Sequence, residues 1–387
     1  MTMLRHLAAA ILVALAAALL SVELGAFRDY QMAQVAVYVV AVAGLSVLIG
    51  LSGQISIGHG AFMAIGAYCA ALLLMHLSWP LEAVLAASAA GTALAGLVVG
   101  VAAARLRGPY LAGVTLMLAV ALPALAFQYP GVFGGDQGLG VSITTPAFLG
   151  PTFPLTRWQA WVATAAALIT LVLLANLAHS RIGRSWRAIR DDETAAALAG
   201  LNVAALRVLA FVISAACAGL AGALLGVITT LVSPGSFTIT LSIALLTAAV
   251  LGGLGTLPGA VWGSLVIVLV PTYITDVATS HGLPSSVAAN IPVAAYGVVL
   301  IAVMLVFPNG IQGGVRRLLG PALPAASGSL SAVRRTARRP GAHPGAGGSP
   351  GALRRMVRPG GPPDADGSLN AFRRQAPANE HPEEGTQ

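Results

Sequence analysis

Long apolar runs alternate with short polar segments along most of this chain. A helix needs about 20 predominantly apolar residues to cross the hydrocarbon core of a bilayer, and several runs reach that length. Each of them predicts a transmembrane helix, and together they indicate an all-α fold. The runs of spanning length lie at roughly 32–51, 54–77, 83–104, 110–128, 158–179, 207–232 and 287–307.

A shorter apolar run, 7–22, follows Arg5 near the N-terminus. Its positive start and short apolar core fit a signal peptide as well as a first span. No clear small-residue cleavage site follows it, which favours a retained span. Both alternatives place Arg28 and Asp29 on the outside, so the later topology does not depend on the choice.

The distribution of arginine orients the spans, because cytoplasmic loops carry an excess of Lys and Arg. With the N-terminus inside, the alternation of crossings places Arg105 and Arg107 inside and the loop 129–157 outside. The charged segment 180–206 is then inside. The arginine-rich tail ends inside only if 241–275, which glycines interrupt, crosses twice or re-enters.

The pattern therefore predicts a polytopic transmembrane helical bundle over residues 1–310. We expect about ten membrane segments, eight full spans and two shorter ones around Gly252–Gly259. The tail 311–387 is rich in Gly, Pro and Arg and has no apolar periodicity, so we expect it to be disordered and cytoplasmic. Attraction to anionic lipid or a soluble partner is one interpretation of its arginines; composition favours an unstructured extension.

The charged segment 180–206 carries a regular pattern between two spans. Four arginines recur at every third position, namely Arg181, Arg184, Arg187 and Arg190. A helix with this spacing carries a basic stripe and places Trp186 and Ile189 on another face. Three acidic residues suited to the N-cap and first turn of a second helix come next, namely Asp191, Asp192 and Glu193. Gly200 suits the left-handed position that ends a helix, so we expect two short helices that form a rigid lever for a soluble partner.

Composition agrees with a membrane protein. Only 9% of the residues are charged and 57% are hydrophobic, whereas soluble domains carry about 25% charged residues. The net charge of +8 comes from 21 arginines and no lysine; the positive-inside rule explains it, and nucleic acid is not expected as a partner. Cys69 and Cys217 lie in apolar runs and suit packing better than a disulfide or a metal site.

Glycine-rich breaks in two halves of the chain indicate a translocation path. Broken helices at membrane depth are tolerated only beside protein or a wet cavity, and paired breaks mark the path in many transporters. The candidate path residues are Gln54, Ser56, Gly58, His59, Gly60, Tyr68, Gly253, Gly255 and Thr256. The alternative is tight helix packing in which His59 donates to a backbone carbonyl, and for His59 this alternative is favoured.

No catalytic or metal-binding constellation is expected. A phosphate-binding loop of the Walker type requires a lysine, and the chain has none. No Ser-His-Asp grouping, HExxH motif or cysteine cluster occurs. If ATP drives transport, another chain must bind it, and the charged segment is where that chain would dock.

Three ordered motifs resemble the M-type permease subunits of branched-chain amino acid ABC importers. Gly50–Tyr68 is similar to the family's G-L-x-G-x-x-S-x-G-H-x-A-F-x-x-x-G-A-Y. Ser180–Asn202 is similar to S-R-x-G-R-x-x-R-A-I-R-x-x-E-x-A-A-x-x-x-G-x-N, and Val250–Gly259 to V-L-G-G-x-G-T-x-x-G. Gly134–Leu139 is a weaker match to G-G-x-x-G-L. The resemblance covers roughly 30–310.

This resemblance implies one subunit of a heteromeric importer in the cytoplasmic membrane. The other subunits would be an H-type permease, two cytoplasmic ATPases that bind the ATP, and an extracytoplasmic solute-binding protein; the chain itself would need no cofactor. The residues expected to couple to the ATPases are Arg181, Arg184, Arg187, Arg190, Asp191, Asp192, Glu193 and Gly200. Thr194 stands where the family has Glu, which weakens any salt bridge at that position, although Glu193 is adjacent.

The sequence leaves alternatives open for the transported substrate and for the class of membrane protein. Leucine, isoleucine and valine are what the resemblance implies, while urea and short amides are handled by close relatives. An ion-coupled transporter or channel would need an ionisable residue at bilayer depth, for which His59 is the candidate. A structural membrane protein would need neither a broken path nor a lever.

Overall fold

The computed structural model describes residues 25–77, 79–105, 109–146, 150, 152–280, 297–298, 301–303, 305, 307 and 310–319. These residues all belong to one structural unit that comprises residues 1–321. The predicted run 7–22, most of 287–307 and the tail beyond residue 319 lie outside the described residues. Within the described part the chain is helical apart from one pair of two-residue strands.

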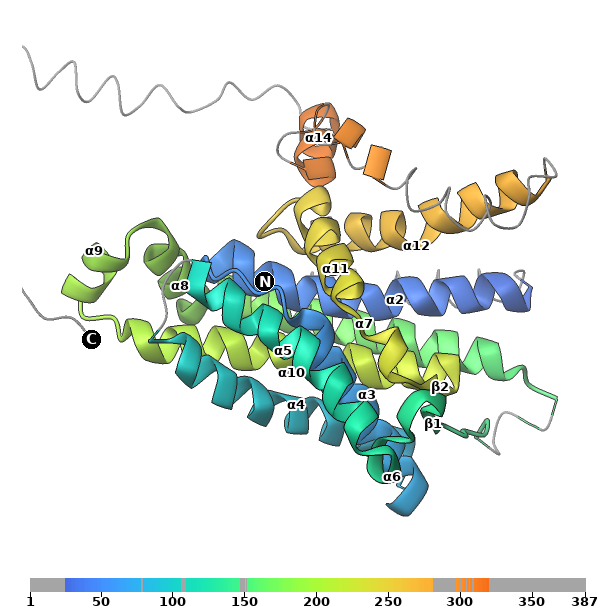
Figure 1. The fold of residues 1–387 in the computed structure, drawn as a ribbon. Coiled ribbons are helices and arrows are strands. Elements are labelled where there is room, and N and C mark those ends of the chain that lie inside the picture. The colour runs from blue at the N-terminus through green and yellow to red at the C-terminus, as the bar shows by residue number, and fades with distance from the viewer. Residues whose placement is uncertain are drawn as a thin grey trace, which may run out of the picture. The chain divides into compact units, whose positions relative to one another are not determined.

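Among the described residues of the first half of the chain, five α-helices follow one another, and Figure 1 shows their arrangement. Their bounds are α2 Ala26–Ser46, continued by the π-helix η1 Val47–Leu51, then α3 His59–Leu77, α4 Leu81–Ala103, α5 Pro109–Gln128 and α6 Pro130–Phe133. A 3-10 turn, η2 Gly135–Gln137, leads to strand β1 Leu139–Gly140.

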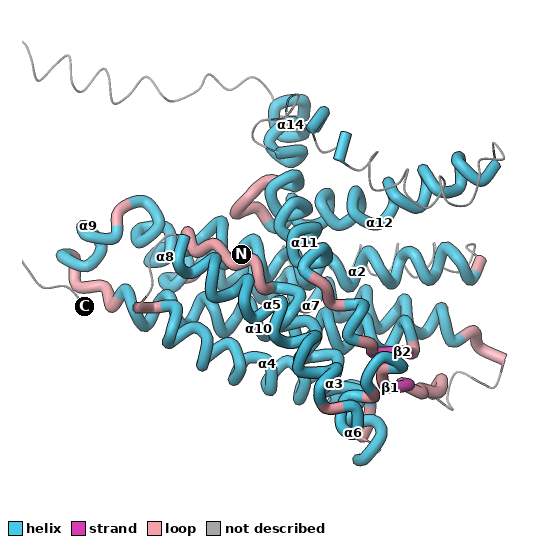
Figure 2. Tube along the Cα trace, in the orientation of Figure 1, coloured by secondary structure: helices cyan, strands magenta, loops and turns pink. Residues whose placement is uncertain are grey.

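The second half begins with the long helix α7 Leu155–His179, and its elements are coloured by type in Figure 2. It continues through α8 Arg181–Asp191, α9 Glu193–Leu198, α10 Val203–Thr229, β2 Leu231–Val232, η4 Pro234–Ser236, α11 Ile239–Gly252, α12 Leu257–Ser280 and α14 Gly310–Leu319. Strands β1 and β2 pair antiparallel, with Leu139 opposite Val232.

Eight helices among the described residues are long and apolar enough to cross a membrane. Six of them match predicted runs. The stretch 241–275 is divided into two such helices, α11 and α12, which contact each other. The helix predicted over 54–77 begins only at His59, and within the irregular segment before it Gln54 and Ile57 make tertiary hydrogen bonds.

Helices α2 and α10 form the centre of the bundle and are its most buried spans. α10 packs on α4, α3 and α2, and α2 also packs on α7 and α12. Small residues allow this close packing: a Cβ added to Gly66 would lie 2.1 Å from the Gly219 carbonyl oxygen, and one added to Gly222 would lie 1.8 Å from that of Met63.

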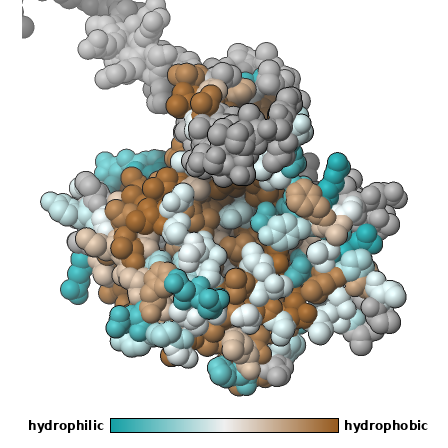
Figure 3. Space-filling model, turned by 45° about the vertical axis from the view of Figure 1, so that its right-hand side comes forward, coloured by the Kyte–Doolittle hydropathy of each residue, from teal (hydrophilic) through white to brown (hydrophobic). Residues whose placement is uncertain are grey.

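The surface of the helices carries many exposed apolar side chains. Leu94 on α4 is 66% exposed and Met117 on α5 is 74% exposed. Figure 3 shows hydrophobic residues spread over the face in view, between patches of more polar residues. Such a surface suits contact with lipid better than contact with water.

Two differences from the sequence expectation concern the ends of the bundle. Asp29, expected in an outside loop, lies in the first turn of α2 and is buried, with its carboxylate 3.6 Å from the Arg157 guanidinium. The tail was expected to be disordered from residue 311, but Gly310–Leu319 form helix α14, which contacts α11 and α12. Trp262 Nε1 donates to Gln312 Oε1 at 3.1 Å and helps to hold α14 in place.

Candidate functional site

The two glycine-rich breaks of the sequence meet in space. A Cβ added to Gly50, in η1, would lie 2.1 Å from the backbone nitrogen of Gly255, in the turn between α11 and α12. Gly253 and Gly255 have φ values of 114° and 75°, a region that side-chain-bearing residues rarely adopt. We call the contact of the Gly50 and Gly255 backbones, together with the neighbouring positive-φ residues Gly53 and Gly253, the glycine junction.

The helix that enters the junction changes its winding there. α2 continues into the π-helix η1, and π-turns of this kind are frequent at functional sites. The chain leaves η1 through Gly53, whose φ is 73°, and the Gly53 and Gln54 amides donate to the carbonyls of Ile49 and Leu48 at 3.1 and 3.3 Å. These bonds end the helix and start an irregular segment that extends to Gly58.

Polar groups of this irregular segment are buried. Gln54 Nε2 donates to Ser52 Oγ at 3.0 Å and to the Arg207 carbonyl at 3.2 Å. Gln54 Oε1 and Ser56 Oγ are buried without a hydrogen-bond partner. Buried polar atoms are nearly always paired, so these two acceptors have free hydrogen-bonding capacity, as does the Tyr68 hydroxyl, which is likewise buried without a partner.

His59 begins α3 and is fully buried. Its Nε2 donates to the Ala41 carbonyl of α2 at 3.0 Å, as the helix-packing alternative expects. The next residue, Gly60, donates its backbone N–H to Ser242 Oγ of α11 at 3.1 Å. Both contacts tie the start of α3 to neighbouring helices; substrate contact by His59 stays a prediction.

The predicted path residues do not all lie together. Gly58 lies against the Thr115 backbone of α5, and Thr256 Oγ1 donates to the Gly253 carbonyl at 2.8 Å within the turn. Tyr68 lies nine residues beyond His59 on α3, about 13 Å along the helix axis. Its ring packs edge-on against Phe133 with centroids 5.0 Å apart, so it lies away from the glycine junction.

The charged segment folds as its residue pattern predicts. Ser180 caps α8 by accepting from the Ile182 N–H at 3.1 Å, and Asp192 caps α9 by accepting from the Thr194 N–H at 2.9 Å. Gly200 has a φ of 86° and its amide bonds to the Ala197 carbonyl. The Leu201 amide bonds to the Ala196 carbonyl, which completes a Schellman motif at the end of α9.

One face of α8 is packed against the spans. Trp186 is fully buried and its Nε1 donates to the Leu206 carbonyl at the start of α10 at 2.8 Å. Arg187 Nη1 donates to the Ala178 carbonyl of α7 at 3.1 Å. Ile189 is also buried, so the apolar face of α8 anchors the helix together with Arg187 of the arginine stripe.

The predicted coupling residues divide between inward and outward contacts. Glu193 forms an ion pair with Arg207 of α10 at 2.8 Å, and Arg190 donates to the Gly50 carbonyl and to Asp191. Arg181 and Arg184 are exposed. Arg207 and Gly53 were not among the predicted site residues; a lone arginine just inside a span was the available signal for Arg207.

The exposed side of the charged segment faces away from the spans. Leu198 on α9 is 86% exposed, the highest exposed fraction among the large apolar side chains of the described residues, and Asp191 is 67% exposed. Figure 1 shows α8 and α9 at one end of the helices, opposite the end where β1 and β2 pair. An exposed leucine beside arginines and acids suits a protein surface that docks there.

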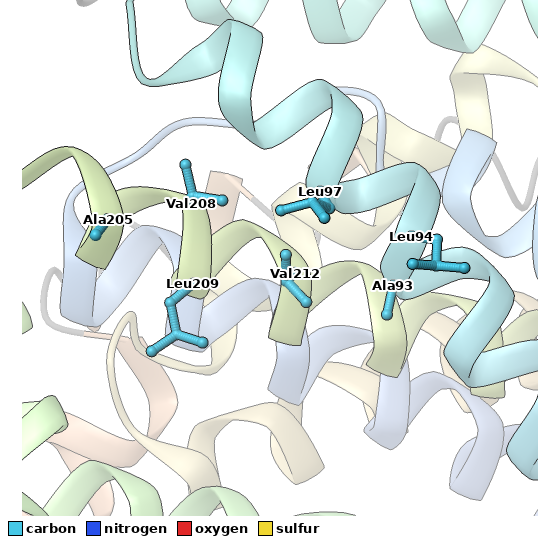
Figure 4. Close-up of a pocket in the computed structure, with 7 residues that line it drawn as sticks. All are labelled: Ala93, Leu94, Leu97, Ala205, Val208, Leu209 and Val212. Atoms are coloured by element: carbon cyan, nitrogen blue, oxygen red, sulfur yellow. The ribbon is translucent and has the colours of Figure 1, made fainter.

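A surface groove between α4 and α10 offers little to a polar ligand. It has a volume of about 470 Å³ and is lined by Ala93, Leu94 and Leu97 of α4 and by Ala205, Val208, Leu209 and Val212 of α10 (Figure 4). These side chains carry no polar atom, and no predicted path residue lines the groove. Among the described residues no three His, Cys, Asp or Glu side chains are grouped so that they could hold a metal ion.

Comparison with known proteins gives the same assignment as the motifs. Residues 27–308 match the family described as "Branched-chain amino acid transport system / permease component". Proteins named high-affinity branched-chain amino acid transport system permease protein LivM, from Salmonella typhimurium and Escherichia coli K12, are 33% and 32% identical over 256 residues. Those alignments span 60% of this chain and 60% of each LivM protein.

Relatives of the second permease type match over more of their length. The LivH protein of Escherichia coli K12 is 30% identical over 303 residues, and the BraD protein of Pseudomonas aeruginosa is 31% identical over 302 residues. Each match spans 71% of this chain and 91% of the relative. The fold has no significant match among solved structures. The family match extends from the first turn of α2 to just before α14, and the chain therefore belongs to the family of branched-chain amino acid transport permease components.

Proposed function

We propose that this chain is a transmembrane permease subunit of an ATP-driven importer that carries leucine, isoleucine and valine across the cytoplasmic membrane. The observation that supports this most directly is the meeting of three motifs at one place. Arg190 of the charged segment bonds to Gly50, and Gly50 packs on Gly255. A segment suited to docking is thus in contact with the first helix break of the candidate path, and that break packs on the second.

The proposed assembly has four partner chains of three kinds. An H-type permease would pair with this chain in the bilayer, two ATPases would dock on the cytoplasmic side and bind ATP, and a solute-binding protein would deliver the amino acid outside. The outward side chains Arg181, Arg184, Asp191 and Leu198 form the proposed ATPase-facing surface. In this orientation the tail is cytoplasmic.

The proposed path runs beside the glycine junction. Gln54 Oε1 and Ser56 Oγ have unused acceptor capacity there, which suits an ammonium group. The spans keep their charged residues near helix ends, which supports a source of energy other than an ion gradient.

Uptake by the purified complex tests the proposal. The chain is tagged, its partners are co-purified from the native membrane and identified, and the complex is placed in vesicles with ATP. We expect uptake of labelled leucine that needs ATP and the binding protein and that continues when the proton gradient is collapsed. Competition by urea or acetamide instead of valine would contradict the substrate class, and uptake that follows the proton gradient without ATP would contradict the importer.

A further inference from the structure

Arg190 joins α8 to a part of the chain far away in sequence. The side chains of Arg184, Trp186 and Arg187 bond to the end of α7 and the start of α10, which flank α8. Arg190 Nη1 instead donates to the carbonyl of Gly50, 140 residues earlier. The contact therefore links the charged segment to the last turn of a central span.

The bond fills a need at the end of η1. The last carbonyls of a helix have no partner within it, and a cation there interacts favourably with the helix dipole. The Leu48 and Ile49 carbonyls accept from the Gln54 and Gly53 amides, and the Gly50 carbonyl accepts from the Arg190 guanidinium.

The site around Arg190 is shaped for this side chain. A Cβ added to Gly53 would lie 2.9 Å from Arg190 Cγ, so glycine leaves the room that the side chain occupies. On its other side the guanidinium donates to Asp191 Oδ1 from Nε at 3.2 Å and from Nη2 at 3.0 Å. Asp191 thus holds the plane of the guanidinium while Nη1 reaches Gly50.

Beyond Gly50 the contacts are between backbones. Gly50 lies on Gly255, and a Cβ added to Gly310, the first residue of α14, would lie 2.5 Å from the Gly253 Cα. Backbone contacts of this kind have no flexible side chain between them that could absorb a shift. A displacement of η1 would therefore reach the turn between α11 and α12.

We propose that Arg190 is a positioning residue for transport, which ties α8 to the carbonyl of Gly50 so that a movement of α8 shifts the glycine junction. This deepens the proposed function and rests on it. Arg190 acts inside the permease on this account, and the ATPase contacts are left to the outward side chains of the segment.

The first test measures coupling in the vesicle assay described above. Arg190→Gln keeps the length of a polar side chain and removes the cation; we expect assembly with the ATPases to be kept and leucine uptake per ATP hydrolysed to fall about tenfold, the size expected for a lost charge-assisted hydrogen bond. Arg190→Lys keeps a cation that reaches Gly50 and should retain at least a third of the ratio. Arg105→Gln, at the end of α4, is the matched control and should keep the normal ratio.

The second test measures the effect of the bond between Arg190 and the Gly50 carbonyl without any substrate. In the purified complex we expect amide exchange at Gly53 and Gln54 to become about tenfold faster in Arg190→Gln and to stay near normal in Arg190→Lys and Arg105→Gln. Gly53→Ala displaces the Arg190 side chain, and its effect should not add to that of Arg190→Gln. If Arg190→Gln does not accumulate, the comparison is made between Gly53→Ala, which displaces the Arg190 side chain, and Arg190→Lys, which keeps a cation near Gly50.

The outcomes separate the two proposals. Absence of leucine uptake by the unaltered complex would reject the proposed function. The amide-exchange result would still support or contradict the bond between Arg190 and the Gly50 carbonyl. Normal uptake per ATP in Arg190→Gln would overturn the positioning role. Loss of the ATPases from the purified Arg190→Gln complex would also overturn it, because Arg190 would then be a docking residue.

Discussion

Glu193 at the start of α9 and Arg207 near the start of α10 form an ion pair, with carboxylate and guanidinium 2.8 Å apart. Both side chains are at least two-thirds buried, and the backbone carbonyl of Arg207 accepts from Gln54. The pair thus fixes α9 to the same residue that holds the irregular segment after η1. The place where α8 meets α9 is thus attached to the spans twice, by the bond from Arg190 to the Gly50 carbonyl and by the ion pair of Glu193 with Arg207.

A double-mutant cycle should reveal this attachment. We expect Glu193→Gln and Arg207→Gln each to lower the free energy of unfolding, with a coupling energy of about 1 kcal/mol between them. Thermal unfolding of the detergent-purified complex measures it. Glu82→Gln, an exposed acid at the start of α4, should show no coupling with Arg207→Gln; strict additivity for the Glu193 pair would mean that the ion pair contributes nothing.

The glycine junction should not tolerate a methyl group. In Gly50→Ala the new Cβ would meet the Gly255 backbone, which cannot rotate away as a side chain could. We expect a loss of about 1–3 kcal/mol in stability and a loss of leucine uptake. Gly113→Ala on α5 has open space around the new Cβ and should behave as the unaltered chain. Normal transport by Gly50→Ala would show that the two breaks separate easily.

Trp186 should contribute in two distinguishable ways. Trp186→Phe keeps an aromatic ring and removes the Nε1 donor to the Leu206 carbonyl, so we expect a loss of about 1 kcal/mol. Trp186→Ala also empties a fully buried site and should cost about 3–5 kcal/mol. Melting temperatures of the purified complex should follow that order. Equal melting temperatures for the two variants would assign the whole effect to the hydrogen bond.

Cysteine labelling tests the orientation of the charged segment. In a chain without Cys69 and Cys217, Leu198→Cys should react with an impermeant maleimide only after the membrane is opened, because the positive-inside pattern predicts a cytoplasmic position for this segment. Val132→Cys, half-exposed in α6, should react in intact cells. Labelling of Leu198→Cys from outside would reverse the topology and remove the basis for ATPase docking.

Substitutions of His59 distinguish ATP-driven transport from proton-coupled transport. If its role is the bond to the Ala41 carbonyl, His59→Gln keeps a donor and should retain most of the uptake, whereas His59→Leu should lower it together with stability by about 1–3 kcal/mol. The ATP requirement should be the same in both variants. If His59→Gln transports nothing while assembly and stability are normal, His59 acts on the substrate or on a coupled proton.

The local pattern of residues determined much of this protein. Six apolar runs became spans close to the predicted bounds, because burying apolar side chains away from water depends mainly on the run itself. The caps at Asp192 and Gly200 were likewise predictable, since a cap is a contact between neighbours in sequence. Family motifs added the expectation that the breaks around Gly50 and Gly255 matter.

The tertiary structure decided which of these residues touch. Nothing near Arg190 in sequence indicates that its partner is the Gly50 carbonyl, because the donor of a helix-capping bond can come from any part of the chain. The late start of α3 also involves distant partners: the Thr115 hydroxyl of α5 accepts from the Ile57 amide, and the Arg207 carbonyl of α10 accepts from the Gln54 side chain. Helix α14 is short, and it forms against α11 and α12, a surface that only the folded bundle provides.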